Sequence, residues 1–224
     1  FMGDMIQYSG IADRLYETLY VALGPARGGL ALATVLFGTV LAACLGIIAA
    51  SVSMLCILGL TPMIKRGYAK DLACGCVAAG GCLGILIPPS IMIVMYGPIA
   101  NVSVGKLFMG AFPAGFLLAG LYCAYIIIRS IIRPKDAPAL PKEERTTPTG
   151  KKIRDLMVSL VPPILLILSV LGVIFFGIAA PTEAAGMGAM AATLLAIAYR
   201  RFNFKVFKFV ALDTLKVSGY IFFL

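Results

Sequence analysis

The residues best suited to chemistry lie at positions 80–101, GGCLGILIPPSIMIVMYGPIAN, where glycines and prolines interrupt an apolar stretch. Pro88 and Pro89 lack backbone N–H groups and clash with the preceding turn, so we expect no continuous helix through them. Carbonyls freed before the prolines need polar partners, because lipid supplies none. Interrupted helices of this kind bind ions and small molecules in membrane proteins. The alternative is a simple proline kink, but the Gly-rich run before Pro-Pro-Ser favours a functional break.

A second set of small and hydroxyl residues lies near the centre of the uncharged run 30–64. Their carbonyls and hydroxyls could coordinate a dehydrated cation such as Na⁺, and the N-terminus of a half-helix could attract an anionic group. The same residue types also favour close helix packing, which is the alternative for each one taken singly. With the proline stretch, the candidates are Gly46, Ser51, Ser53, Gly84, Pro88 and Ser90.

Enzyme chemistry is not expected. The chain has no His, no G-x-S-x-G motif, no G-x-x-x-x-G-K-[ST] phosphate loop and no pair of carboxylates inside an apolar run. Its six cysteines lie in apolar runs without a C-x-x-C pair, so we expect no zinc site and no cofactor. A protein with this inventory does not hydrolyse ATP by itself.

Composition indicates a membrane protein with several spans. Of the 224 residues, 61% are hydrophobic and 13% are charged, whereas soluble domains have about 45–50% apolar and about 25% charged residues. The net charge of +9 comes from basic residues clustered between apolar runs. Such clusters are typical of cytoplasmic loops beside a lipid bilayer, and we expect no binding to nucleic acid.

Five segments follow from the hydrophobic pattern. We expect a helix end and an amphipathic interfacial helix over 1–28, and a re-entrant hairpin over 29–68, with one long tilted span as the alternative to the hairpin. A broken transmembrane helix and a following span occupy 69–133. A polar, Pro-rich cytoplasmic linker covers 134–155, and spans near 156–178 and 184–199 begin a second half over 156–224. The three basic clusters, near Lys65, Arg133 and Arg200, are separated by pairs of spans and should share one side.

The tripeptide Pro181-Thr182-Glu183 predicts a helix start. Proline suits an early helical position, and a carboxylate in the first turn opposes the positive end of the helix dipole. Glu183 is the only acid between Asp155 and Asp213. It could therefore be a helix-cap carboxylate at the outer surface or a group that holds a cavity or a domain contact.

Several motifs together resemble a known family. The stretch GILIPPSIMIVMYGPIANVSVGKLFMGAFPAGFLLAGLY resembles the central signature of the large membrane subunit of TRAP (tripartite ATP-independent periplasmic) transporters. SGIADRLYE followed by RGGLALATVL, then MIKRGYAKDLA, then APTEAAGMGAM before AYRRFN, match the family in order and approximate spacing.

The resemblance implies an all-α polytopic membrane protein with the fold of an elevator-type secondary transporter, built from inverted repeats with re-entrant hairpins and broken helices. Such permeases import organic acids, often carboxylates, on a Na⁺ gradient across the bacterial inner membrane. They work with a small membrane subunit and a periplasmic substrate-binding protein. The chain would be about half to two-thirds of such a subunit, because the second hairpin and second broken helix are absent from it.

With this resemblance, our hypothesis places a cation between the hairpin tip and the break. The expected cation-binding residues are Gly46, Ser51, Gly84, Pro88 and Ser90; the expected substrate contacts are Ser53, Ser90 and Asn101; and Pro89, Pro181, Thr182 and Glu183 shape the backbone. We expect no metal other than Na⁺. Leu45 and Cys82 stand where related sequences are expected to have Thr.

Two alternatives to this function stay open. One is an elevator-type anion symporter that works without a binding protein. The other is a membrane scaffold subunit that transports nothing, because an incomplete elevator cannot complete a site.

Overall fold

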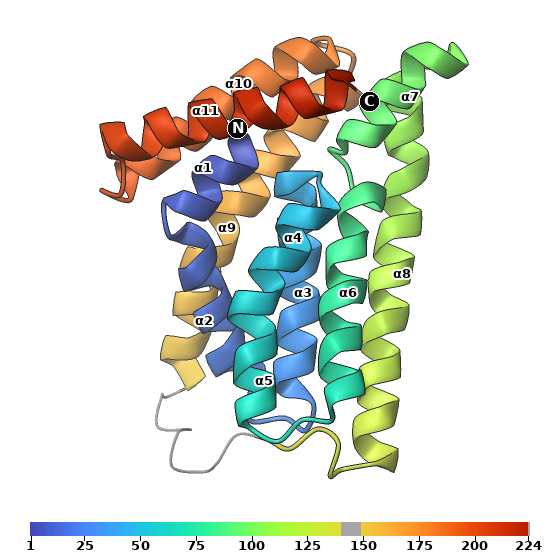
Figure 1. Ribbon diagram of the computed structural model, residues 1–224, viewed down its shortest axis with the longest axis vertical. Coiled ribbons are helices and arrows are strands. Elements are labelled where there is room, and N and C mark those ends of the chain that lie inside the picture. Colours follow the sequence, from blue (N-terminus) through green and yellow to red (C-terminus); the bar gives the residue numbers. More distant parts are fainter. Residues whose placement is uncertain (140–148, 224) are drawn as a thin grey trace.

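The computed structural model describes residues 1–139 and 149–223, which form helices and contain no β-strand. Figure 1 shows the arrangement. The elements in chain order are α1 (Met2–Tyr8), α2 (Ile11–Leu23), α3 (Gly29–Leu45), α4 (Ile48–Leu55), the π-helical turn η1 (Cys56–Leu60), α5 (Thr61–Lys65), α6 (Lys70–Leu86), α7 (Ile91–Ala100), α8 (Val104–Ile132), α9 (Thr149–Phe175), α10 (Pro181–Ala198) and α11 (Phe204–Phe223). The predicted all-α class is confirmed.

Within the described residues, four helical stretches are long and apolar enough to cross a membrane by length and composition. They are Ile48–Lys65, Lys70–Ala100, Val104–Ile132 and Arg154–Phe175. A hydrocarbon core about 30 Å thick needs about 20 apolar residues in helical form. The chain is therefore a polytopic membrane protein, as its composition predicts.

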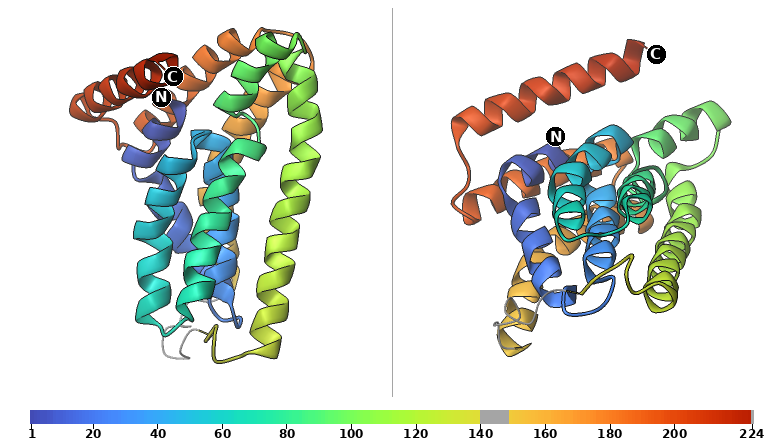
Figure 2. Two further views of the ribbon diagram at one scale, coloured as in Figure 1. Left: turned by 45° about the vertical axis from the view of Figure 1, so that its right-hand side comes forward. Right: turned by 60° about the horizontal axis from the view of Figure 1, so that its bottom comes forward.

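Most helices run along the long axis of a bundle, and α10 and α11 run across one end of it (Figures 1 and 2). Helices α3 and α6 form the most extensive pair in the bundle. Their backbones approach closely because a Cβ on Gly38 would lie 3.0 Å from the Cα of Gly80. Small residues allow such contact, and close packing drives helix association where lipid weakens the hydrophobic effect.

The hairpin predicted from the run 30–64 is a pair of helical arms. Helix α3 ends at Leu45, Gly46 has a left-handed φ of +64°, and α4 begins at Ile48. The second arm continues through η1 and α5, back along α3 (Figure 1). The chain thus reverses between α3 and α4, near the centre of the run 30–64, and does not form one long helix. The re-entrant placement in the bilayer stays a prediction.

Helix α2 differs from the interfacial helix expected over 1–28. Its apolar stripe includes Ile11, Leu15 and Leu19, which are each less than 5% exposed. The helix packs against α3 and α9. The apolar face of α2 is therefore covered by protein rather than by lipid headgroups.

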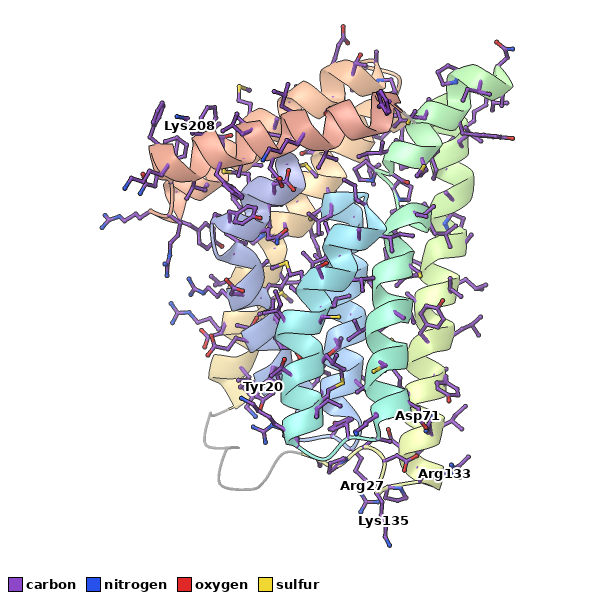
Figure 3. All side chains as sticks on the ribbon, viewed as in Figure 1. Tyr20, Arg27, Asp71, Arg133, Lys135 and Lys208 are labelled. Carbon is purple, nitrogen blue, oxygen red and sulfur yellow. The ribbon has the colours of Figure 1, made fainter. Side chains whose placement is uncertain are left out.

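The basic clusters do not share one end of the bundle. Arg133 and Lys135 lie at the end opposite Lys208, as Figure 3 shows. The reason lies in the expected span over 184–199, which corresponds to α10. The chain turns at Gly177, where φ is +67°, and α10 then runs across the end of the bundle instead of back along it. Of the expected linker 134–155, residues 140–148 lie outside the described residues, and residues 149–155 belong to α9.

Candidate binding cavity

The interruption expected at the prolines lies between α6 and α7. Helix α6 ends at Leu86 and α7 starts at Ile91, and both Ile87 and Ser90 have extended backbone angles. Ile87 is buried and packs on α8, where a Cβ on Gly115 would lie 2.7 Å from its Cγ1. The missing N–H groups of the prolines explain the break, and Gly115 gives it room beside α8.

The hairpin tip meets this break. A Cβ on Gly46 would lie 3.1 Å from the carbonyl oxygen of Pro89, 3.5 Å from the backbone nitrogen of Ile91 and 3.6 Å from the Cα of Ser90. Gly46 also has the positive φ that glycine tolerates best. Two segments separated by about forty residues of sequence are thus in backbone contact, and glycine is what permits it.

A cavity of about 360 Å³ opens beside the tip and the break. Its lining is mostly apolar, with a few polar side chains, as is usual for small-molecule sites. The polar side chains are those of Asp4, Ser90, Thr182, Thr214 and Ser218.

Three helix N-termini border the cavity. Ile47 precedes α4, Ser90 precedes α7, and Pro181 and Thr182 form the first turn of α10, and all four residues line it. The first N–H groups of a helix lack intrahelical partners and carry partial positive charge, so such ends attract anions. The last residues of α3, Cys44 and Leu45, also line the cavity. They bring to it a helix C-terminus, which favours cations.

Ser90 carries a buried hydroxyl without a hydrogen-bond partner in the described residues. It is 1% exposed, and its hydroxyl has no hydrogen-bond partner within the described part of the chain. Ser51 differs, because its hydroxyl donates to the carbonyl of Ile47 at 3.0 Å. Buried hydroxyls are nearly always paired, so the orphaned hydroxyl of Ser90 at the cavity wall points to a polar ligand.

We expect Ser90→Ala to leave the free energy of unfolding unchanged or to raise it by up to about 1 kcal/mol, because an unpaired buried hydroxyl is costly. Ser159→Ala is a matched control, since Ser159 is 2% exposed, also lacks a partner in the described residues and lies outside the cavity lining. Denaturant unfolding in detergent measures both variants. A loss above about 1 kcal/mol for Ser90→Ala alone would mean that Ser90 has a protein partner.

The structure places the other predicted residues in different surroundings. Gly84 is buried in the last turn of α6, and Pro88 is buried in the break, but neither lines the cavity. Ser53 is exposed on α4, and Asn101 is exposed at the end of α7, where its φ is +54°. The cavity therefore joins Ser90 to Pro89, Pro181 and Thr182, with Gly46 in contact behind them.

Glu183 caps α10. Its Oε2 accepts a hydrogen bond from the backbone N–H of Ala180 at 3.1 Å, and its side chain is exposed. This geometry agrees with the first of the two roles considered for this carboxylate, the helix cap.

We expect Glu183→Ala to lower the free energy of unfolding by about 0.5–1 kcal/mol, because it removes both the cap and a favourable charge at a helix N-terminus. Glu183→Gln should lose less, since an amide oxygen can still accept from Ala180. Unfolding in mixed micelles, followed by circular dichroism, measures both. Equal stability of all three proteins would contradict the capping role.

One acidic residue that lines the cavity was not predicted from the sequence. Asp4 of α1 lines it, and the hydroxyl of Thr214 on α11 lies 3.4 Å from its Oδ2. A carboxylate in an apolar segment is a signal of function, but local periodicity cannot bring together residues 210 positions apart. Of the two departures noted in the sequence, Leu45 lines the cavity, whereas Cys82 is exposed on α6.

These features define a class, the polytopic α-helical membrane proteins in which a hairpin tip meets an interrupted helix beside a cavity. Comparison with family models adds the particular family. Residues 1–224 match the model described as "Tripartite ATP-independent periplasmic transporter, DctM component". The chain therefore belongs to the family of TRAP transporter large permease subunits, and the predicted resemblance is confirmed.

Curated relatives agree. The C4-dicarboxylate TRAP transporter large permease protein DctM of Pseudomonas aeruginosa is 34% identical over 87% of this chain and 44% of its own length. Its namesake in Vibrio cholerae is 38% identical over 81% of this chain and 38% of that protein. The isethionate TRAP transporter permease protein DctMQ of Oleidesulfovibrio alaskensis is 35% identical over 84% of this chain and 28% of that protein. The chain thus spans less than half the length of these relatives.

Proposed function

We propose that this chain is part of the large permease subunit of a Na⁺-coupled importer of organic acids, in which the cavity beside the tip and the break holds both the cation and the substrate. The family and the multi-pass membrane character support the permease role. The observation that carries the proposal is the backbone contact between Gly46 and Pro89–Ser90 beside the unpartnered hydroxyl of Ser90.

The cation is assigned to the junction of tip and break. Na⁺ prefers oxygen ligands, and broken helices supply them as backbone carbonyls and hydroxyls. The carbonyl of Pro89 and the hydroxyl of Ser90 lie on the break, and the C-terminus of α3 faces the same cavity. A cation there would order the break against the tip. Substrate would then bind a site that is already ordered, which couples the two ligands.

The substrate is assigned to the part of the cavity bordered by the N-termini of α4, α7 and α10. Their partial positive charges suit a carboxylate, and no Arg or Lys side chain is among the described residues that line the cavity. Two of the relatives are named for C4-dicarboxylates and one for isethionate, all of which are organic anions. We extend that class, without a particular acid, to this chain.

The partners and the mode of transport belong to the same proposal. A small membrane subunit and a periplasmic binding protein complete a tripartite transporter, and the relative from Oleidesulfovibrio carries the combined name DctMQ. Alternating access in the inner membrane would move the hairpin and the broken helix together, as an elevator, because α3, α4 and α6 pack as one unit.

The test is uptake by the complete permease, with its membrane partner and binding protein, in proteoliposomes without ATP. We expect uptake of a dicarboxylate to require an inward Na⁺ gradient and the binding protein. Uptake at the same rate without Na⁺ would contradict the coupling ion. Uptake without the binding protein would instead support a symporter that works alone. No uptake under any of these conditions would support the scaffold alternative.

A further inference from the structure

A second cavity lies between α6 and α8, outside the tip and the break. Its volume is about 430 Å³, within the range of small-molecule clefts. The walls are mainly apolar and include Leu72, Gly75 and Ala79 of α6 and Leu121, Tyr122 and Ile126 of α8. No step of the proposed transport cycle uses this crevice.

The crevice runs along both helices by the same length. Its lining extends from Asp71 to Ala79 on α6 and from Leu121 to Arg129 on α8, which is about 12 Å on each helix at 1.5 Å per residue. Helix α6 belongs to the candidate span Lys70–Ala100, and α8 is the candidate span Val104–Ile132. The crevice therefore starts at the end of the bundle that carries Asp71 and Arg129. From there it reaches about 12 Å along the apolar part of both helices, as far as the exposed side chain of Leu121.

The mouth of the crevice is basic. The guanidinium of Arg129 donates to the hydroxyl of Tyr125 at 2.9 Å and pairs with Asp136 at 3.2 Å, so it is held in place. Three further cations, those of Arg27, Arg133 and Lys135, lie at the same end of the bundle in Figure 3. They are exposed, and no acid of the described residues pairs with any of them.

Acidic groups at the mouth do not cancel this charge. Asp136 is neutralised by Arg129, and Asp71 lines the crevice without an ion pair to any of the described residues. Asp71 therefore shares this end of the bundle with three cations, and within the described residues no ion pair involves Asp71 or any of the three. Tyr122 and Tyr125 line the crevice together with Arg129, and tyrosines next to a basic residue are typical of the headgroup level of a bilayer.

We propose that this crevice binds a phospholipid with an anionic headgroup. One acyl chain lies between α6 and α8 along Gly75 and Leu121, and the phosphate lies among Arg133, Lys135 and Arg129. Basic pockets between transmembrane helices recognise anionic headgroups. A lipid would occupy both the apolar walls and the basic mouth, whereas a soluble anion would use the mouth alone.

The test measures binding of phosphatidylglycerol to the complete permease by native mass spectrometry in mild detergent, with phosphatidylethanolamine as the comparison lipid. Gly75→Leu adds a side chain at the crevice wall, and its Cβ has room, because a Cβ at Gly75 would meet no atom within 4 Å. Gly110→Leu is the matched control, since Gly110 is equally open but does not line the crevice. Arg133→Gln with Lys135→Gln removes charge and leaves the apolar walls intact.

We expect the wild-type permease and Gly110→Leu to retain phosphatidylglycerol in preference to phosphatidylethanolamine. Gly75→Leu should lose both lipids, and the double charge variant should bind phosphatidylglycerol about 25-fold more weakly, at about fivefold per basic residue. Unchanged binding in Gly75→Leu would overturn the proposal. Displacement of the lipid by inorganic phosphate would also overturn it. The same holds if the wild-type permease binds no phospholipid because another protein segment fills the crevice.

Discussion

Gly46→Ala should reduce Na⁺-dependent uptake by the complete permease at least about tenfold while the protein still inserts in the membrane. Gly46 has a φ of +64°, where an added Cβ costs about 1–2 kcal/mol. That Cβ would also lie 3.1 Å from the carbonyl oxygen of Pro89. The tip and the break must then shift apart by a few tenths of an ångström, which disturbs the junction assigned to the cation. Uptake in proteoliposomes and the yield of folded protein from membranes measure the two effects separately.

Gly67→Ala is the control that separates strain from contact. Gly67 has a φ of +77°, and a Cβ there would meet no atom within 4 Å. Both variants carry the same backbone strain, so both should lose about 1–2 kcal/mol of stability. Only Gly46→Ala should lose uptake. If Gly67→Ala reduces uptake as much as Gly46→Ala does, the contact between tip and break is not what transport requires.

Gly38→Ala should lower the free energy of unfolding by about 1–3 kcal/mol, the usual cost of overpacking a close contact. A Cβ on Gly38 would lie 3.0–3.1 Å from backbone atoms of Gly80, which cannot turn aside as a side chain can. Helices α3 and α6 must therefore move apart along the most extensive interface of the bundle. Denaturant unfolding in mixed micelles measures the change.

Gly120→Ala is the control for Gly38→Ala and should not lower the free energy of unfolding. Gly120 is exposed in the middle of α8, and a Cβ there would meet no atom within 4 Å. Alanine is a better helix former than glycine by about 1 kcal/mol, so this variant should be as stable as the wild type or more so. A Gly38→Ala protein that is also stabilised would show that α3 and α6 do not pack at the distance described.

Local chemistry made the break and the tip predictable from sequence. Pro88 and Pro89 cannot continue a helix wherever they lie, and the structure ends α6 at Leu86. The tip is similar, because Gly46 lies at the centre of a small-residue run and tolerates a positive φ. Both features depend on a few adjacent residues, which is why they could be located to within a few positions.

Features that depend on distant contacts were not predictable in this way. Gly84 was expected in the break because glycine is a poor helix former, yet the packing of α6 keeps it helical and buried. The expected span over 184–199 has enough apolar residues, but α10 lies across the end of the bundle on α1 and α9. The entry of Asp4 and Thr214 into the cavity depends on the same tertiary packing.

The central claim is that the tip and the break share one cation site, and the Na⁺ dependence of uptake by Ser90→Ala tests it most directly. A hydroxyl bound to a charged group contributes about 1.5–3 kcal/mol. Ser90→Ala should therefore need at least about tenfold more Na⁺ for half-maximal uptake. Ser159→Ala, which removes another buried hydroxyl without a partner in the described residues, should match the wild type. Identical Na⁺ dependence in all three proteins would contradict the site.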